Sequence, residues 1–194
     1  INDCAGSTPV KVDGRIVELL QFCREVYDRT GGTVNAGMGG VLALWHQART
    51  KGLQNPELAI LPDPVDLQQA ALHTNLDNLV IDEDTSSAFI KDPLMQLDVG
   101  AIAKGYAVEQ VCRSAPEGML ISVGGNVCAT GPKPGRIPWT VGIQDPDGGE
   151  GAYLHTLSVS SGCVVTSGDY QRTYWVDDTA YHHIIDPENL MPGR

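Results

Sequence analysis

The segment Leu97–Ala107 constrains the fold of this chain more than any other stretch. Its apolar start ends in Asp98, Gly100 then interrupts the extended pattern, and the small residues that follow are typical of a helix start. Because glycine commonly marks the turn between two elements, the segment predicts a β-strand that leads into a helix.

The start of this predicted helix is a candidate anion site. The first backbone N–H groups of a helix lack partners and the peptide dipoles add, so a helix start attracts negative charge. Lys104 adds a positive charge there, and Asp98 could face a ribose hydroxyl or a metal ion. The arrangement suits a nucleotide pyrophosphate. The alternative interpretation is an ordinary strand–helix connection with a surface lysine.

Charge and cysteine content exclude several classes of partner and site. The net charge of −11 argues against nucleic acid and against an anionic membrane surface, because both require a basic face. Five cysteines are scattered without C-x-x-C spacing, so neither a zinc site nor a disulfide framework is expected. Cys23 and Cys112 fall in helical apolar patterns and are interpreted as buried small hydrophobes.

The order of the predicted elements favours an α+β fold with antiparallel strands, because helices come early and strands late. Helices are expected at residues 12–29 with Asp13 as N-cap, in a short stretch through Trp45 and His46, at 64–73 and at 101–114. Strands are expected at 79–82, 87–91, 95–99 and 118–123, followed by a meander at 139–144, 154–159, 163–166, 170–176 and 181–185.

Three further clusters carry residues suited to chemistry. Gly124–Asn126 lets backbone approach a ligand or forms a tight turn, and Thr166–Tyr170 is a polar site or a hairpin loop. In Tyr181–Pro187, an extended backbone would place His182 and His183 on opposite faces, so only one of them can point into a given site. A histidine there could accept a proton near neutral pH, orient a loop or cap the core.

Together these clusters resemble the ApbE-type family of FAD:protein FMN transferases. The stretch that resembles the family's signature is Asp98–Ala107. The motifs that follow in the family's order are Gly124–Asn126, Ser167–Tyr170 and His183–Pro187. The region Asn35–Trp45 is similar to the family's D-x-x-x-G-x-L…W region, with less common residues at Asn35, Met38 and Gly40.

The resemblance implies a fold, an activity and a partner. The fold would be an ApbE-like, T-fold-related architecture with helices packed on an antiparallel or mixed sheet. The enzyme would bind FAD and Mg²⁺, transfer FMN to a threonine hydroxyl of a partner flavoprotein and release AMP. Two alternatives are a metal-dependent FAD pyrophosphatase that yields FMN and AMP, and a non-catalytic FAD-binding module.

The resemblance also implies roles for individual residues. Lys104 and His183 would be catalytic, with Lys104 near the phosphates and His183 assisting deprotonation of the acceptor threonine. The residues implied to contact FAD are Ala36, Gly37, Met38, Asp98, Lys104 and Ile184. The backbone carbonyl of Ala101 would be a metal ligand.

The resemblance covers nearly all of residues 10–194. It implies a single FAD-binding domain over residues 1–194 that lacks the family's first strands and its C-terminal metal-ligand segment. We therefore expect this stretch to hold metal weakly or not at all. We also expect the intact protein to be extracytoplasmic and lipid-anchored, as members of the family often are.

Overall fold

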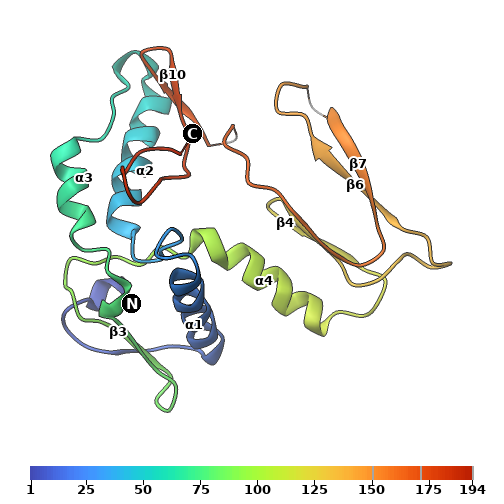
Figure 1. Cartoon of the computed structure of the whole chain (residues 1–194), viewed down its shortest axis with the longest axis horizontal. Coiled ribbons are helices and arrows are strands. Elements are labelled where there is room, and N and C mark those ends of the chain that lie inside the picture. The colour runs from blue at the N-terminus through green and yellow to red at the C-terminus, as the bar shows by residue number, and fades with distance from the viewer. Residues whose placement is uncertain (150, 171, 194) are drawn as a thin grey trace. The chain divides into compact units, whose positions relative to one another are not determined.

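The computed structural model describes residues 1–149, 151–170 and 172–193. The chain divides into two compact units (Figure 1). The first unit comprises Ile1–Ala101 and Gln171–Arg194, and the second comprises Ile102–Tyr170. Helices and antiparallel sheets are mixed, which confirms the α+β prediction. The expectation of a single domain over residues 1–194 stays a prediction.

One part of the first unit is a three-stranded antiparallel sheet with a helix packed against it. The strands β1 (Val10–Lys11), β2 (Leu79–Asp82) and β3 (Ser87–Ile90) lie in the order β1-β3-β2. The helix α1 (Gly14–Arg29) contacts β2 and buries Val17, Leu19, Leu20 and Cys23. The side chain of Asp13 accepts the N–H of Arg15, which confirms the predicted N-cap and ties down a free donor of the first turn. The β2–β3 hairpin is also confirmed.

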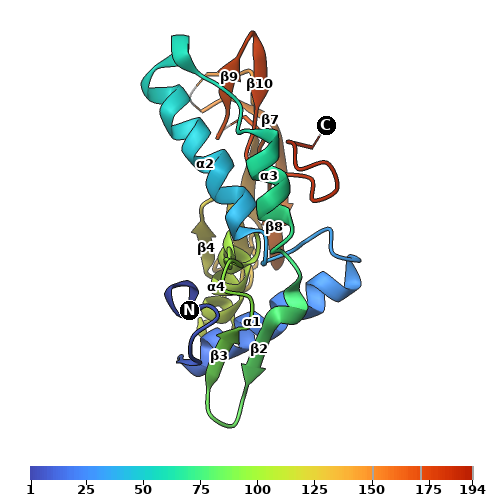
Figure 2. The same cartoon turned by 90° about the vertical axis from the view of Figure 1, so that its left-hand side faces the viewer.

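The other part of the first unit is built around α2 (Gly39–Gln54). The helix α3 (Pro64–Ala71) lies beside α2 in both views (Figures 1 and 2), and the hairpin of β9 (Tyr174–Val176) and β10 (Thr179–Tyr181) also packs against it. The core that these elements share consists of Met38, Val41, Trp45, Ala48, Leu67 and Tyr174. Short 3₁₀ turns at Asn2–Cys4 (η1), Pro56–Leu58 (η2) and Leu76–Asn78 (η3) complete the unit.

The helix α2 is longer than the short helix predicted, and it continues through Gly52. A Cβ at position 52 would lie 2.8 Å from Cδ2 of Tyr174. Glycine is therefore present at this position to let an aromatic ring approach the helix. The backbone stays helical to Gln54, two residues before Pro56.

The predicted strand at residues 95–99 is wrong. The structure has only an isolated parallel bridge between Met38 and Gln96. The backbone of Leu97, between these residues, is bonded by a side chain. The side chain of Asn2 accepts the Leu97 N–H at 2.9 Å and donates to the Leu97 carbonyl at 3.0 Å.

The second unit contains a three-stranded antiparallel sheet, a separate hairpin and most of α4 (Gly100–Ser114), which starts in the first unit. The sheet has the order β4-β5-β8, with β4 at Leu120–Val123, β5 at Asn126–Ala129 and β8 at Gly162–Val165. The hairpin consists of β6 (Trp139–Gln144) and β7 (Tyr153–Val159). The prediction of a continuous meander is wrong, since β8 pairs with β5 rather than with β7 among the described residues.

The last two strands are shorter than predicted. The strand expected at 170–176 begins at Tyr174, and Gln171 lies outside the described residues. The strand expected at 181–185 ends at Tyr181, so the alternation considered for the two histidines does not apply. Among the described residues, no helix combines the length and apolar character needed to cross a bilayer.

Candidate functional site

Two of the segments implied to bind FAD lie side by side in the first unit. Residues 36–39 and 96–98, called here the paired segments, run parallel through the bridge between Met38 and Gln96. The Ala36 carbonyl accepts the Asp98 N–H at 2.8 Å, and the Gly39 N–H donates to the Gln96 carbonyl at 2.9 Å. Residues 57 to 62 positions apart in the sequence are thereby fixed against each other at the point where α4 begins.

Glycine is needed at two positions of the first paired segment. A Cβ at Gly39 would lie 2.6 Å from the Gln96 carbonyl oxygen, and a Cβ at Gly37 would lie 2.6 Å from the Thr74 carbonyl oxygen. Real Cβ atoms do not come so close to backbone, so a larger residue at either position would push the neighbouring backbone away. Gly39 therefore sets the spacing of the paired segments, and Gly37 sets the distance to Thr74.

The side-chain amide of Asn35 connects the first of the paired segments to the backbone of Thr74. Its Oδ1 accepts the Gly37 N–H at 2.7 Å, and its Nδ2 donates to the Thr74 carbonyl at 2.9 Å. An aspartate could make only the first of these bonds, since it has no donor when ionised. The presence of Asn35 is thus explained by the Thr74 carbonyl, which no pattern in the sequence points to.

The side chains of the first paired segment are buried. Ala36 is 3% exposed and Met38 is 5% exposed, and Met38 belongs to the core around α2. Gly37 and Gly39 are buried as well, so residues 36–39 are covered along their whole length in the described structure.

The start of α4 is held by Asp98. Its Oδ1 accepts the Gly100 N–H at 2.7 Å, and Asp98, Gly100 and Ala101 are all exposed. One carboxylate oxygen of Asp98 thus orients the helix start. The Ala101 carbonyl lies in the first helical turn, where an oxygen ordinarily accepts the N–H four residues on and keeps one lone pair for a ligand.

Parts of three other motifs converge in the second unit. The Lys104 ammonium lies 3.5 Å from the Gly124 carbonyl oxygen. A Cβ on Gly125 would lie 3.4 Å from Oγ1 of Thr166, which follows β8. Asn126 begins β5 and is buried, at 7% exposure, against the Gly105 side of α4. The glycine motif, the lysine of α4 and the Thr166 loop are therefore neighbours.

The turn between β4 and β5 is a tight turn, which was one of the two interpretations of the Gly124–Asn126 motif. Gly124 and Gly125 have φ values of +53° and +90°, and Val123 pairs with Asn126 across them. Two consecutive positive φ values are typical of a two-residue type I′ hairpin, which glycine enters without steric cost. The sequence missed β5 because the glycines resemble the end of a strand more than the middle of a hairpin.

The two histidines have different surroundings in the loop that follows β10. The Nδ1 of His182 accepts the Ile184 N–H at 3.2 Å, and its Nε2 lies 2.8 Å from the Gly193 carbonyl oxygen. A carbonyl needs a donor, so His182 bonds as the neutral ring with its hydrogen on Nε2. His182 thus fixes the loop. His183 is half-buried, and Ile184 is 43% exposed.

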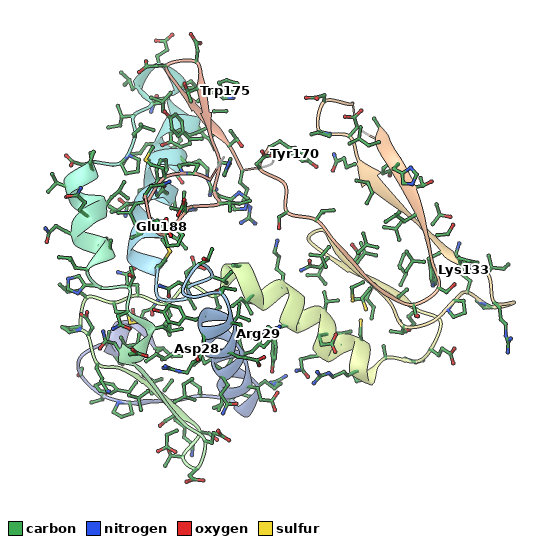
Figure 3. All side chains as sticks on the ribbon, in the orientation of Figure 1. Asp28, Arg29, Lys133, Tyr170, Trp175 and Glu188 are labelled. Atoms are coloured by element: carbon green, nitrogen blue, oxygen red, sulfur yellow. The ribbon has the colours of Figure 1, made fainter. Side chains whose placement is uncertain are left out.

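Asp186 and Trp45 form hydrogen bonds that hold this loop in place. The two carboxylate oxygens of Asp186 accept the Glu188 N–H at 2.8 Å and the Asn189 amide at 3.0 Å. The indole of Trp45 donates to the Leu190 carbonyl at 2.9 Å, which ties the loop to α2. Figure 3 shows Glu188 on this loop.

Among the described residues, no group of three or more His, Cys, Asp or Glu side chains could hold a metal ion. The candidates for a hard cation are the Ala101 carbonyl and the Asp98 carboxylate, which supply fewer oxygens than Mg²⁺ coordinates.

Comparison with known proteins decides the family. The profile of the ApbE family matches residues 1–194. The chain belongs to the ApbE family. It is 32% identical to the FAD:protein FMN transferase of Klebsiella pneumoniae over 196 residues, which cover 99% of this chain and 58% of the relative. It is also 32% identical to the FAD:protein FMN transferase of Treponema pallidum, with 100% of this chain and 56% of the relative covered.

Solved structures agree with the fold. The crystal structure of the ApbE protein of Thermotoga maritima matches with a TM-score of 0.83 and 32% identity, over 100% of this chain and 62% of that one. The chain thus spans 56–62% of the length of these three ApbE relatives. The FAD, metal and catalytic roles of individual residues stay predictions at this point, because these likenesses do not test them.

Proposed function

We propose that this chain is the FAD-binding part of an FAD:protein FMN transferase, which moves FMN from FAD to a threonine hydroxyl of a partner protein and releases AMP. The observation that carries the proposal is the pairing of residues 36–39 with 96–98, which leads directly into the exposed start of α4. The names of the Klebsiella and Treponema relatives support the reaction class.

The chemistry of the proposed reaction fits the groups found in each unit. Phosphoryl transfer depends on positioning and on neutralising charge at the phosphate oxygens. The N–H groups at the start of α4 and the exposed Lys104 ammonium supply positive charge for a pyrophosphate. The glycines of the β4–β5 turn carry no side chain to block a ligand beside Lys104. Asp98 is assigned to a ribose hydroxyl.

The bonds of the reaction balance as a displacement. The acceptor hydroxyl oxygen attacks the FMN phosphorus, and the bond between that phosphorus and the bridging oxygen breaks. AMP leaves with the bond's electron pair, and His183 receives the hydroxyl proton. Ile184, with 43% of its surface exposed, is assigned to contact with the flavin nucleotide.

Mg²⁺ is part of the proposal as a group that adds positive charge at the phosphate oxygens when bound. Because the described residues offer few oxygen ligands, the metal should bind this chain weakly alone and more tightly once FAD supplies its phosphates. Isothermal titration with Mg²⁺, in the absence and presence of FAD, measures both affinities. Tight Mg²⁺ binding without FAD would contradict this assignment.

A mass-spectrometric assay tests the reaction itself. The intact protein is incubated with FAD, Mg²⁺ and an acceptor domain that carries a target threonine, with a threonine-to-valine acceptor as control. The proposal predicts that only the threonine acceptor gains the mass of FMN, and that AMP appears in equal amount. Free FMN and AMP without acceptor modification would indicate a pyrophosphatase, and unchanged FAD would indicate a binding module. Either result would overturn the transferase assignment.

The proposal includes an extracytoplasmic location, with a lipid anchor on the intact protein. Its support is the resemblance to the ApbE family. Metabolic labelling with a fatty acid, followed by fractionation, should place the labelled intact protein in the membrane fraction. An unlabelled protein in the cytosolic fraction would refute this part of the proposal.

A further inference from the structure

Three of the cysteines gather in the second unit, although they are far apart in the sequence. Cys112 lies on α4, Cys128 on β5 and Cys163 on β8. Cys128 is paired with Cys163 across β5 and β8, and Cys112 and Cys128 line the same cavity. The described residues contain no group of three side chains able to hold a metal ion, so the chemistry available to this cluster is that of thiols.

The strand register places Cys128 and Cys163 directly opposite each other on β5 and β8. The kind of pair follows from the type I′ turn at Gly124–Gly125. Val123 and Asn126 close this two-residue turn and exchange both backbone hydrogen bonds. Hydrogen-bonded pairs alternate along a ladder, so Ile121 and Cys128 form the next one.

The backbone groups of Cys128 therefore point to β4, and its pair with Cys163 is of the non-hydrogen-bonded kind. In such pairs the Cα atoms are about 4.5 Å apart, which falls within the range that a disulfide spans. Directly paired residues also share one face of the sheet, so the two thiols lie on the same side. Cys112 has no such register with either of them, because it lies on a helix.

Access to the pair differs between its two members. Cys163 is exposed, whereas Cys128 is 5% exposed. A cavity of about 460 Å³ is lined by Cys112 and Cys128 together with Glu109, Arg113, Ala115, Glu117, Ala129 and Thr130. An oxidant in solution thus reaches Cys163 first, and Cys128 lies beside it to complete the reaction.

We propose that Cys128 and Cys163 form a reversible disulfide between β5 and β8 when the protein meets a small-molecule disulfide such as oxidised glutathione. The Cys163 thiolate attacks one sulfur of the oxidant and displaces the first glutathione thiolate. The Cys128 sulfur then attacks the Cys163 sulfur of the mixed disulfide and displaces the second. Two protein thiols are oxidised, one small disulfide is reduced to two thiols, and the protons pass to the leaving thiolates.

The second step is the slower one. Burial raises the pKa of the Cys128 thiol, and its contacts with Cys163 and Cys112 raise that pKa further. Less of the attacking thiolate is therefore present at neutral pH, so the glutathione adduct on Cys163 should appear before the internal disulfide.

The test is disulfide mapping on the native protein. The chain is incubated with oxidised glutathione, the remaining thiols are alkylated, and unreduced peptides are identified by mass spectrometry. The expected result is a Cys128–Cys163 cross-link that disappears on treatment with dithiothreitol. Cys163→Ser should abolish the cross-link, whereas Cys112→Ser and the control Cys4→Ser, from the first unit, should retain it.

Three results would overturn the inference. They are the absence of the cross-link in the native protein, a cross-link from Cys112 in its place, and a glutathione adduct on Cys163 that never resolves. Cys128→Ala adds a second variant, in which the adduct should persist. Because Cys163 is exposed, the Cys163→Ser protein keeps the test decisive even where Cys128→Ala fails to fold.

Discussion

At the scale of single residues, Lys104 carries the most specific prediction about the ligand. Its side chain is exposed, and its ammonium lies 3.5 Å from the Gly124 carbonyl oxygen, so it adds charge without supporting the core. Lys104→Ala should therefore leave the fold intact and weaken FAD binding about tenfold to a hundredfold, the usual range for losing a charged hydrogen bond. Titration of FAD fluorescence measures the change.

The matched control for Lys104 is Lys133, which belongs to the same unit. Its ammonium lies over the Trp139 ring, 5.0 Å from the ring centre. Lys133 is labelled in Figure 3. Lys133→Ala removes the same charge and should leave FAD affinity unchanged. A folded Lys104→Ala protein with native affinity would remove Lys104 from the site.

Tyr174 gives a prediction about alkaline stability. Burial, with a smaller contribution from the neighbouring Tyr181, raises the pKa of Tyr174 to about 12. The phenol of an unfolded chain ionises near pH 10, below the folded value. The stability contributed by the neutral phenol is therefore fully present below about pH 10 and is lost as the pH rises towards 12.

Thermal unfolding of the native protein and of Tyr174→Phe between neutral and strongly alkaline pH checks this. The variant loses the hydrogen bond from Tyr174 to the Ile60 carbonyl, so it should be less stable at neutral pH. Its stability should nevertheless fall less steeply above about pH 10. Equal slopes for the two proteins would show that Tyr174 does not titrate with folding.

Sequence patterns at this scale identify residue types better than residue partners. Strand alternation predicted that only one of His182 and His183 points into a site, but it did not say which one. The argument does not apply in any case, because the strand ends at Tyr181. The bonds that settle the part of His182 come from Gly193 and Ile184 in a loop. Loop bonds of this kind leave no periodic signal.

At the scale of elements, the features that depend on neighbouring residues were predicted correctly, whereas those that depend on distant contacts were not. The Asp13 cap, the β2–β3 hairpin and the helix after Gly100 follow from neighbouring residues, and the structure has all three. The strand expected at 95–99 fails because Asn2 satisfies the backbone of Leu97 from far away in the sequence. Gly52 inside α2 also meets a distant residue, since a Cβ there would lie 2.8 Å from Cδ2 of Tyr174.

The paired segments give an element-scale prediction with a built-in control. Gly39 and Gly40 both lie in the first turn of α2. A Cβ at Gly39 would lie 2.6 Å from the Gln96 carbonyl oxygen, whereas a Cβ at Gly40 would meet only the Ala70 Cβ at 3.7 Å. Gly39→Ala should therefore destabilise the protein by about 1–3 kcal/mol.

Gly40→Ala should be neutral or stabilising by up to about 1 kcal/mol, since alanine is the better helix former. Urea unfolding of the two variants measures both changes. Gly39→Ala should also weaken FAD binding if the pairing positions the nucleotide. Similar stabilities for the two variants would show that the spacing of the paired segments is not restricted at Gly39.

At the scale of the whole molecule, the fold class could be predicted but the division into units could not. The early helices and late strands indicate an α+β protein, and the chain is one. The unit boundary falls inside α4, and β9 returns to pack on α2 from more than a hundred residues away. Neither feature has a local signature, because contacts of such long range depend on complementary surfaces and not on neighbouring residues.

The net charge of −11 bears on how the whole molecule meets its ligand. FAD is itself anionic, so long-range electrostatics oppose its approach and local donors must supply the attraction. The candidates are the start of α4 and Lys104. Screening by salt should therefore weaken FAD binding less than it would for a basic protein, in which long-range attraction assists.

The most direct test of the account is equilibrium binding of FAD to the intact protein in saturating Mg²⁺, measured by isothermal titration. We expect one FAD bound per chain, with the affinity reduced by Lys104→Ala and by Gly39→Ala and unchanged by Lys133→Ala. A folded intact protein with no measurable affinity for FAD under these conditions would contradict it.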